Sequence, residues 1–401
     1  MQTGSSLVDY SSRDESWMPV GSHEMESGMH ARHWRWLVGI GLLVVTFVAP
    51  LSHTSAKQHS SAYELVDLGP GAVLDVADPF CSLFARGGEG VSSTGVVVGQ
   101  RLMDTGEAVP ATTGSTGSSK FKKLKASSAG GSALDVNASG TAVGKINVAS
   151  DDTYCGDFRK SVLPVLWAAD GKRTDLPTGD YANGRADAIN DKGEIVGLVT
   201  NVDSEVQPAH WRDGAVEALP LLQPESLGGN AYGINASGVI VGSCFSVDAT
   251  GYASDFATIW QDGAAAELDL LDGTGSVAYA INDDGLIVGN IIFTESDGTQ
   301  RQAAIEWQDG EATELPTVDG AFSSVPFAVN ASGDAVGMVQ SADGQQAVAW
   351  IDGDLVLVSD LVPDAEGWVF SAAKDISDDG TIVGYGEFDG VFHAFVLRPA
   401  A

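Results

Sequence analysis

The segment Ile281–Gly289, which reads INDDGLIVG, decides how the chain folds. An apolar residue enters, the motif N-x-x-G turns the backbone, and a short apolar run that contains a second glycine leaves. Asparagine hydrogen-bonds its own backbone in turns and glycine supplies a positive φ, so the pattern predicts a β-hairpin. The glycine inside the outgoing strand indicates a position where another backbone approaches closely.

The same hairpin unit occurs seven times, at intervals of about 47 residues, and every copy ends in G-x-x-V-G. We interpret the first polar residue of each copy as a structural turn residue. These residues are Ser92, Asn137, Asn190, Asn235, Asn282, Asn330 and Ser377. Repetition at this period predicts an array of similar β units rather than an irregular fold.

A second unit, in outline A-x-x-W-x-D-G with Pro or Ala at its first position, alternates with the first. Its tryptophans are Trp167, Trp211, Trp260, Trp307 and Trp350. We name the strand that ends at the Trp a, the strand after the D-G turn b, and the strands that enter and leave N-x-x-G c and d. Four strands per period are typical of a β-propeller blade. The regular spacing of the tryptophans indicates packing between blades rather than a stacking platform for a ligand.

We therefore predict an all-β fold, a single β-propeller of seven blades with four antiparallel strands each, over residues 63–399. Tyr63–Gly69 reads as a b strand, and His393–Leu397 reads as an a strand. We expect the C-terminal strand a to pair with the N-terminal strands b–d and so close the ring, which removes exposed sheet edges. An open or split β array is the alternative.

The N-terminal residues 1–56 combine a polar extension with an export signal. Arg32 and Arg35 precede the uncharged run 36–49, and the small residues 54–56 follow Pro50. This is the pattern of a signal peptide, and the run is shorter than the roughly 20 residues of a membrane span. We expect a secreted or periplasmic protein in which residues 57–62 form a linker. An uncleaved N-terminal membrane anchor is the alternative.

Charge and motifs limit the classes of function. The chain has 21 Lys and Arg against 54 Asp and Glu, a net charge of −33. This argues against nucleic acid as a partner, because a binder must bring cations to phosphates. The sequence has no H-E-x-x-H, G-x-S-x-G or phosphate-binding glycine loop. We therefore expect a monomer without a cofactor, and we favour a protein that is not an enzyme.

The two alternating units and the terminal His393-Ala394-Phe395 resemble bacterial extracellular repeat proteins of the HAF family over about residues 63–399. The literal H-A-F triplet occurs only once. The resemblance implies an exported β protein built from repeats, and it implies no established activity.

Variable loops give the better indication of a binding surface. In a propeller the d–a and b–c connections share one face, here called the variable face, and the regular c–d and a–b turns share the other. Binding residues tend to lie on loops held by a rigid scaffold. Two d–a loops combine carboxylates with tyrosine, which suits a sugar or a cation. The candidate ligand-binding residues are Asp151, Asp152, Tyr154, Asp157, Asp248, Tyr252 and Asp255.

Three hypotheses for function follow. We favour an exported binding or interaction module, whose ligand is a polysaccharide, a cell-surface component or a protein. One alternative is a hydrolase or lyase that acts on polysaccharide with two of the loop carboxylates. The other is a purely structural surface protein, in which the candidate loops are ordinary solvated loops.

Calcium and a disulfide are two further options. The acidic turns Asp283–Gly285, Asp378–Gly380 and Asp297–Gly298 offer too few of the about six to eight oxygens that calcium takes, so we interpret them as turns. Calcium stays the alternative. We expect all three cysteines, Cys81, Cys155 and Cys244, on the variable face. An exported protein would form one disulfide among them, with the pair left open.

The second repeat is irregular. Its a strand is expected near residues 107–112 without a Trp, and a segment rich in Gly, Ser and Thr follows. After it comes a cluster of four lysines, Lys120, Lys122, Lys123 and Lys125. The cluster either docks an acidic partner or solvates an exposed loop, and from sequence we favour the solvated loop.

Overall fold

The computed structural model describes residues 63–70, 89–103, 108–114, 118, 120–127, 129–148, 162–201, 205–223, 226–247 and 253–400. The chain divides into residues 1–57 and residues 58–401, and all described residues belong to the second unit. The N-terminal extension, the apolar run 36–49 and the linker 57–62 therefore lie outside the described residues. Within the described ranges, no helix could serve as a membrane span.

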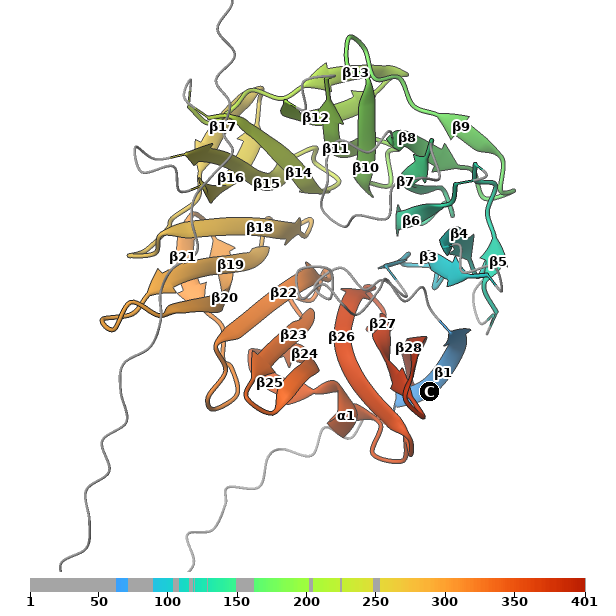
Figure 1. Cartoon of the computed structure of the whole chain (residues 1–401), viewed down its shortest axis with the longest axis vertical. Coiled ribbons are helices and arrows are strands. Elements are labelled where there is room, and N and C mark those ends of the chain that lie inside the picture. Colours follow the sequence, from blue (N-terminus) through green and yellow to red (C-terminus); the bar gives the residue numbers. More distant parts are fainter. Residues whose placement is uncertain are drawn as a thin grey trace, which may run out of the picture. The chain divides into compact units, whose positions relative to one another are not determined.

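Seven blades of four antiparallel strands surround one axis, as the predicted seven-bladed propeller requires (Figure 1). Two neighbouring blades share a single parallel pair, Gln302 with Ser323. We number the blades in chain order. Blade 1 holds β2 (Gly90–Val91), β3 (Val97–Leu102), β4 (Ala108–Thr112) and β5 (Lys122–Lys123). Blade 2 holds β6 (Gly131–Val136), β7 (Ala142–Asn147), β8 (Val162–Trp167) and β9 (Arg173–Asp175). Blade 3 holds β10 (Asn183–Ile189), β11 (Ile195–Thr200), β12 (Val206–Arg212) and β13 (Ala215–Ala218).

The remaining four blades follow the same plan. Blade 4 holds β14 (Gly228–Ile234), β15 (Ile240–Val247), β16 (Ala253–Gln261) and β17 (Ala264–Glu267). Blade 5 holds β18 (Gly275–Ile281), β19 (Ile287–Thr294), β20 (Gln300–Gln308) and β21 (Glu311–Glu314). Blade 6 holds β22 (Ser323–Val329), β23 (Ala335–Ser341), β24 (Gly344–Ile351) and β25 (Asp354–Leu357). Blade 7 holds β26 (Trp368–Ile376), β27 (Ile382–Phe388), β28 (Val391–Pro399) and β1 (Tyr63–Pro70), and the helix α1 (Val358–Leu361) precedes it.

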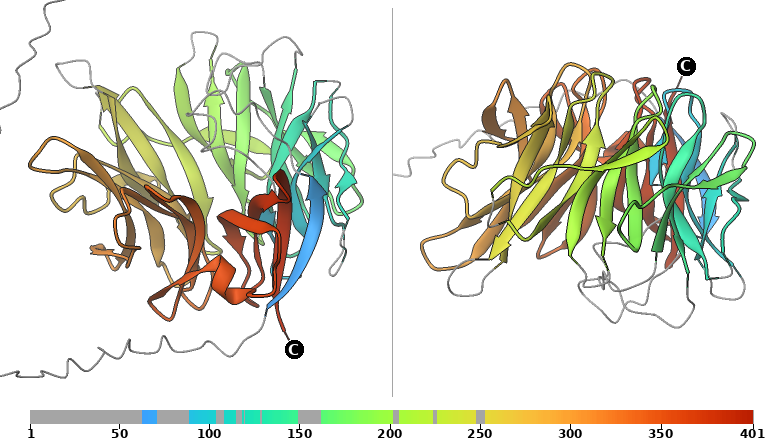
Figure 2. Two further views of the ribbon diagram at one scale, coloured as in Figure 1. Left: turned by 60° about the horizontal axis from the view of Figure 1, so that its bottom comes forward. Right: turned by 90° about the horizontal axis from the view of Figure 1, so that it is seen from above.

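Each blade is ordered c-d-a-b from the axis outward, and the c strands of neighbouring blades contact one another. The strands run between two faces that carry the connections (Figure 2). In blade 5 the c–d turn has Gly285 at φ 84°, and the a–b turn has Asp309 at φ 54° and Gly310 at φ 88°. Positive φ at both central residues is the hairpin geometry that matches strand twist.

The ring closes through β1 and β28. These strands pair in antiparallel fashion from Tyr63 with Pro399 to Pro70 with His393, which confirms the predicted pairing of the C-terminal a strand with the N-terminal b strand. His393 Nδ1 also lies 2.8 Å from Asp67 Oδ1.

The division of strands at the closure differs from the prediction. Blade 7 takes three C-terminal strands and one N-terminal strand, whereas the N-terminal c and d strands, β2 and β3, belong to blade 1. The physical reason is which of the four connections crosses from one sheet to the next. The tight c–d, d–a and a–b connections stay within one sheet, and the b–c connection crosses to the next blade.

A β-bulge in the innermost strand explains the second glycine of each hairpin. In blade 5, Ala278 pairs with Gly289 and Ala280 pairs with Val288, so Tyr279 is an extra residue in β18. The carbonyl of Val277 then lies against Gly289, where a Cβ would collide with it. This is the close backbone approach that the sequence indicates.

The turn asparagines hydrogen-bond neighbouring blades to one another. Asn282 Oδ1 accepts the amides of Asp284 and Leu286 within its own turn, at 3.1 and 2.9 Å, and its Nδ2 donates to the carbonyl of Asn330 in the next blade at 3.0 Å. The same donation, at 3.1–3.4 Å, joins Asn137 to Asn190, Asn190 to Asn235, Asn235 to Asn282 and Asn330 to Ser377.

The tryptophans connect the same blades further from the axis. Each is at most 3% exposed, and its indole N–H donates to a carbonyl that follows the b strand of the preceding blade, at 2.6–2.7 Å. The pairs are Trp167 with Lys125, Trp211 with Pro177, Trp260 with Pro220, Trp307 with Asp269 and Trp350 with Pro316.

Blade 1 departs from the pattern as expected, since β4 forms the a strand without a tryptophan. Thr113 follows β4 where the other blades have Trp, and it is fully buried. Its hydroxyl accepts the amide of Val97 at 3.0 Å. The hydroxyl therefore satisfies the backbone of its own blade instead of reaching the preceding one.

Replacing Trp307 by Phe tests the link between blades. Phe keeps an aromatic ring but leaves the carbonyl of Asp269 without its donor, so we expect the free energy of unfolding to fall by about 1–3 kcal/mol. Urea unfolding followed by far-UV circular dichroism measures the change. The control is Trp368→Phe, because Trp368 stacks on Phe370 within its own strand. An equal loss in both variants would argue against the role of the indole N–H.

Candidate functional site

One position of each innermost strand, three residues before the turn Asn or Ser, collects the chemically varied side chains. In blades 2 to 7 it is the bulged residue, and Glu89 takes the equivalent place in blade 1. We call these seven residues the axial ring. They are Glu89, Leu134, Asp187, Tyr232, Tyr279, Phe327 and Lys374, all partly buried.

Three aromatic rings follow one another on blades 4 to 6. The centroids of Tyr232 and Tyr279 are 5.7 Å apart, and those of Tyr279 and Phe327 are 5.9 Å apart in an edge-to-face arrangement. Lys374 Nζ lies 3.8 Å from the centre of the Phe327 ring, a cation–π contact. We call Tyr232, Tyr279 and Phe327 the aromatic arc.

A buried ion pair lies beside the arc. Arg185 Nε is 2.6 Å from Asp187 Oδ1 on β10. Burial is the largest single effect and lowers the pKa of Arg185, but the charge and hydrogen bond of Asp187, together with the charges of Tyr232 and Glu89, outweigh it, so the net pKa is raised. The guanidinium therefore remains a cation, and it interacts electrostatically with Tyr232 and Glu89.

Asp255 is the one predicted ligand-binding residue within the described ranges, and it lies near the aromatic arc. It lies on β16, where the hydroxyl of Ser243 donates to its Oδ1 at 3.0 Å. Burial raises the pKa of Asp255. Burial also raises the pKa of Tyr232 and Tyr279, and the charge of Asp255 adds to both shifts. The other six candidates, Asp151, Asp152, Tyr154, Asp157, Asp248 and Tyr252, lie outside the described residues.

Asn230, two residues before Tyr232, adds a polar group to this neighbourhood. Its side chain is hydrogen-bonded to Tyr232, and the residue is 6% exposed. Its Oδ1 has no hydrogen-bond partner among the described residues. A buried acceptor without a donor is costly, so this oxygen favours a ligand or solvent donor next to the arc.

The aromatic arc is not among the residues predicted from the sequence, which lie in or next to the d–a loops. The signal was present as Y-G-I-N, Y-A-I-N and F-A-V-N, in which the aromatic residue keeps a fixed offset from the turn asparagine. A repeat position that is aromatic in three consecutive units, charged in three others and Leu134 in the seventh is not serving the common core.

Two further carboxyl groups near the axis connect blades. Asp375 Oδ2 accepts the amide of Val91 in blade 1 at 2.7 Å, and Asp135 Oδ2 accepts the amide of Ile189 in blade 3 at 2.8 Å. The second oxygen of each accepts the next amide of its own strand. Burial raises the pKa of Asp135 to about 6 and that of Asp375 to about 8, with the charge of Asp135 as the second cause for Asp375. Both oxygens of each carboxyl group accept backbone amides, so this geometry favours a structural link between blades, here called a clasp, over acid–base chemistry.

The acidic turns considered for calcium are engaged in the same way. Asp283 Oδ1 accepts the amide of Ala236 at 2.7 Å, and Asp378 Oδ1 accepts that of Ala331 at 3.0 Å, each across a blade boundary. Asp297 instead caps its own turn through Thr299. Within the described ranges, no three His, Cys, Asp or Glu side chains gather as a metal site would need.

The position of Cys244 corrects one expectation. It lies inside β15, where it pairs with Phe256, and not in a loop of the variable face. The thiol is free and 1% exposed in the core between blades 3 and 4, and burial raises its pKa. The strand β15 extends beyond the expected start of the loop, so Cys244 is a strand residue. Its side chain points to the side of the sheet that faces that core. Cys81 and Cys155 lie outside the described residues.

Comparisons with known proteins give only distant structural likenesses. No protein-family model and no curated protein matches the chain. Similar solved structures include YCF48 bound to a D1 peptide, at 14% identity over 85% of this chain and 96% of that chain with a TM-score of 0.44. The β-propeller domain of the Trilobed protease from Pyrococcus furiosus is 12% identical over 67% of this chain and 81% of that chain, with a TM-score of 0.42. TolB from Acinetobacter baumannii is 11% identical over 80% of this chain and 67% of that chain, with a TM-score of 0.41. Likenesses at this level carry no argument about function.

The raised pKa of Asp375 predicts that stability falls as pH rises. A carboxyl whose pKa is higher in the folded than in the unfolded state stabilises the fold fully below its ordinary pKa of 3.8, and that contribution is lost as pH rises toward about 8. The free energy of unfolding should therefore be higher at pH 5 than at pH 8.5. Urea midpoints at the two pH values measure the difference.

The variant Asp375→Asn should reduce this pH difference, because it removes the titrating group. It should also be less stable at pH 5, since Asp375 uses a different oxygen for each of its two backbone N–H groups, and in Asn one of those oxygens becomes an NH2 donor. Asp378→Asn is the matched control, because Asp378 accepts an inter-blade amide from an exposed turn. A wild-type stability that rises between pH 5 and pH 8.5 would contradict the assignment.

Proposed function

We propose that the chain is an exported binding module that holds a neutral polysaccharide against the aromatic arc. The observation that carries the proposal is the run of Tyr232, Tyr279 and Phe327 on three adjacent innermost strands, with centroids 5.7–5.9 Å apart. Pyranose rings present apolar C–H faces that pack on aromatic rings, and their hydroxyls need both donors and acceptors. Rigid aromatic side chains supply contact area at low entropic cost.

The polar groups beside the arc support a ligand rich in hydroxyls. The carboxyl of Asp255 and the unpartnered Oδ1 of Asn230 both accept hydrogen bonds, and Tyr279 carries a phenolic hydroxyl that burial keeps protonated. The net charge of −33 disfavours an anionic polymer. Beside the arc, Asp187 and Glu89 offset the cations Arg185 and Lys374, which leaves no excess of positive charge for such a ligand.

Export and the HAF-repeat family belong to the same proposal. Both rest on sequence patterns, the uncharged run 36–49 and the two alternating repeat units. They agree with a chain that binds sugar polymers outside the cytoplasm.

Binding of the full chain to neutral polysaccharides tests the proposal. Wild-type protein is run by affinity electrophoresis in gels that contain xyloglucan, mixed-linkage β-glucan or galactomannan. We expect retardation by at least one polymer, and Tyr279→Ala should weaken it by about tenfold, because it removes the central ring of the arc. The matched control is Phe293→Ala, since Phe293 lies on β19 under Arg301 and away from the axial ring.

Three outcomes would overturn the proposal. They are no retardation by any neutral polymer, an equal loss in Phe293→Ala, and release of reducing sugar during incubation. The last outcome would favour the hydrolase or lyase alternative.

A further inference from the structure

The lysine cluster forms the outer edge of blade 1. Lys122 and Lys123 make up β5, which pairs with β4 at Thr112 and Ala111. All four lysines of the cluster, Lys120, Lys122, Lys123 and Lys125, are exposed. Among the described residues, none of them forms an ion pair with a carboxylate. In a chain with 54 acidic residues, an unpaired group of four cations is a concentrated patch of the opposite sign.

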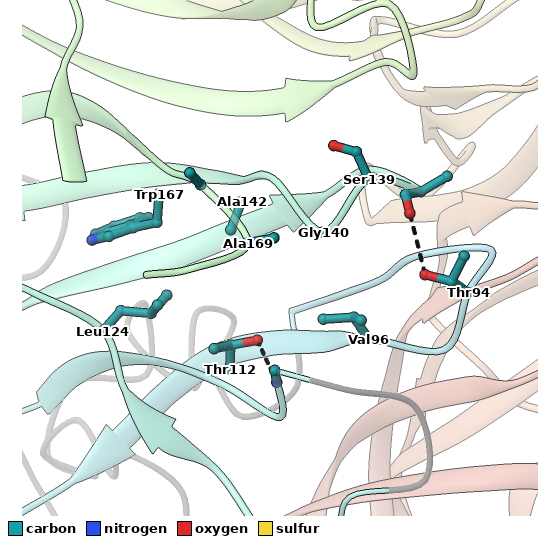
Figure 3. A pocket seen from close by; sticks show the side chains of 12 residues that line it. Thr94, Val96, Thr112, Leu124, Ser139, Gly140, Ala142, Trp167 and Ala169 are labelled. Carbon is teal, nitrogen blue, oxygen red and sulfur yellow. Dashed lines mark hydrogen bonds between the residues drawn. The ribbon is translucent and has the colours of Figure 1, made fainter. Parts of the chain in front are cut away.

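A pocket of about 140 Å³ lies beside this edge, between blades 1 and 2 (Figure 3). Thr112 and Gly114 line it, and Thr112 is the direct strand partner of Lys122. Lys122 Nζ lies 3.9 Å from where a side chain on Gly114 would begin. The ammonium group therefore stands at the rim of the pocket.

The hairpin of blade 2 that lines the pocket differs from the equivalent hairpins of the other blades. Its a–b turn reads W-A-A-D-G, whereas the other tryptophan units have a single residue between Trp and D-G. Ala168 and Ala169 therefore stand where the equivalent turn of blade 3 carries Arg212. The two alanines line the pocket with short apolar side chains.

The lining combines an apolar wall with hydroxyl groups. Val96, Ala168 and Ala169 supply the accessible apolar wall, with Trp167 and Leu124 buried behind it. Thr94, Ser139 and Thr112 supply hydroxyls. Thr112 Oγ1 accepts the amide of Gly114 at 3.0 Å, which leaves its own hydrogen to donate to a ligand.

We propose that this pocket and the lysine edge bind an acidic polysaccharide, with one uronic acid unit in the pocket. The sugar ring lies against Val96 and Ala169, and its hydroxyls bond to Thr112 and Ser139. The carboxylate meets Lys122 at the rim, and the carboxylates of neighbouring units meet the other lysines of the edge. Charged edge strands also prevent sheet association, but that role does not require a hydroxyl-lined pocket next to the lysines.

The site is separate from the aromatic arc. It lies among the regular turns of blades 1 and 2, whereas the arc lies on the innermost strands of blades 4 to 6. Its ligand is anionic, and the ligand proposed for the arc is neutral. The two proposals therefore stand or fall independently.

Affinity electrophoresis of the full chain in polygalacturonate gels tests the proposal, with added salt varied from low to moderate. We expect retardation that salt weakens, because the lysines act as exposed charges. The double variant Lys122→Glu and Lys123→Glu should bind about tenfold or more weakly at low salt. The matched control is Lys192→Glu, an exposed lysine on the c–d turn of blade 3.

A charge-neutral variant separates the pocket from the charge patch. Ala169→Leu fills the pocket without touching a lysine, and we expect it to lose binding to polygalacturonate about as strongly as the lysine variant. Poly-glutamate serves as the acidic-peptide probe. We expect it to bind more weakly than polygalacturonate, and we expect Ala169→Leu to leave its binding unchanged. Thermal melting by circular dichroism checks that each variant is folded.

No binding to polygalacturonate, or unchanged binding in the lysine variant, would overturn the proposal. Unchanged binding in Ala169→Leu, or equal binding of poly-glutamate, would replace the proposed sugar site with a general acidic docking edge.

Discussion

The carboxamide of the turn asparagine is the interaction on which the rest of the structure depends. Its oxygen holds the c–d turn, and its nitrogen reaches the carbonyl of the next blade, so one side chain fixes both a hairpin and the angle between two sheets. Serine replaces it at Ser92 and Ser377, where the inter-blade link passes to other groups. At the second of these positions, Asp375 supplies the link to Val91.

Because these few residues link the blades, the other residues of the innermost strand are not needed for that purpose. The turn residues and the tryptophans hold the blades together, so the bulged position of each c strand is not needed for packing between blades. The axial ring can therefore vary from Glu89 through Tyr279 to Lys374 without loss of the fold. The same reasoning applies to blade 1, whose missing tryptophan is compensated within the blade by Thr113.

Repeat spacing predicted the seven blades, the four strands of each and the pairing of the two termini, because turn chemistry and strand alternation are local. The assignment of three C-terminal strands to the closing blade was not predicted, because it depends on which connection crosses between sheets. Cys244 was misplaced because strand ends are set by pairing partners such as Phe256. The arc around Tyr279 was missed although its fixed offset from the turn asparagine is visible in the sequence. The clasp at Asp375 could not be derived, because Asp375 meets Val91 only when the ring closes.

Unfolding of Asn282→Asp tests the central claim most directly. Aspartate keeps an oxygen for the amides of Asp284 and Leu286 but places a second oxygen, rather than a donor, against the carbonyl of Asn330. The account predicts that the free energy of unfolding at pH 7 falls by about 1–3 kcal/mol, while Asp284→Asn in the same exposed turn changes it by less than about 0.5 kcal/mol. Unchanged stability in Asn282→Asp would show that the turn oxygen alone matters, and the asparagine link between blades would then be discarded.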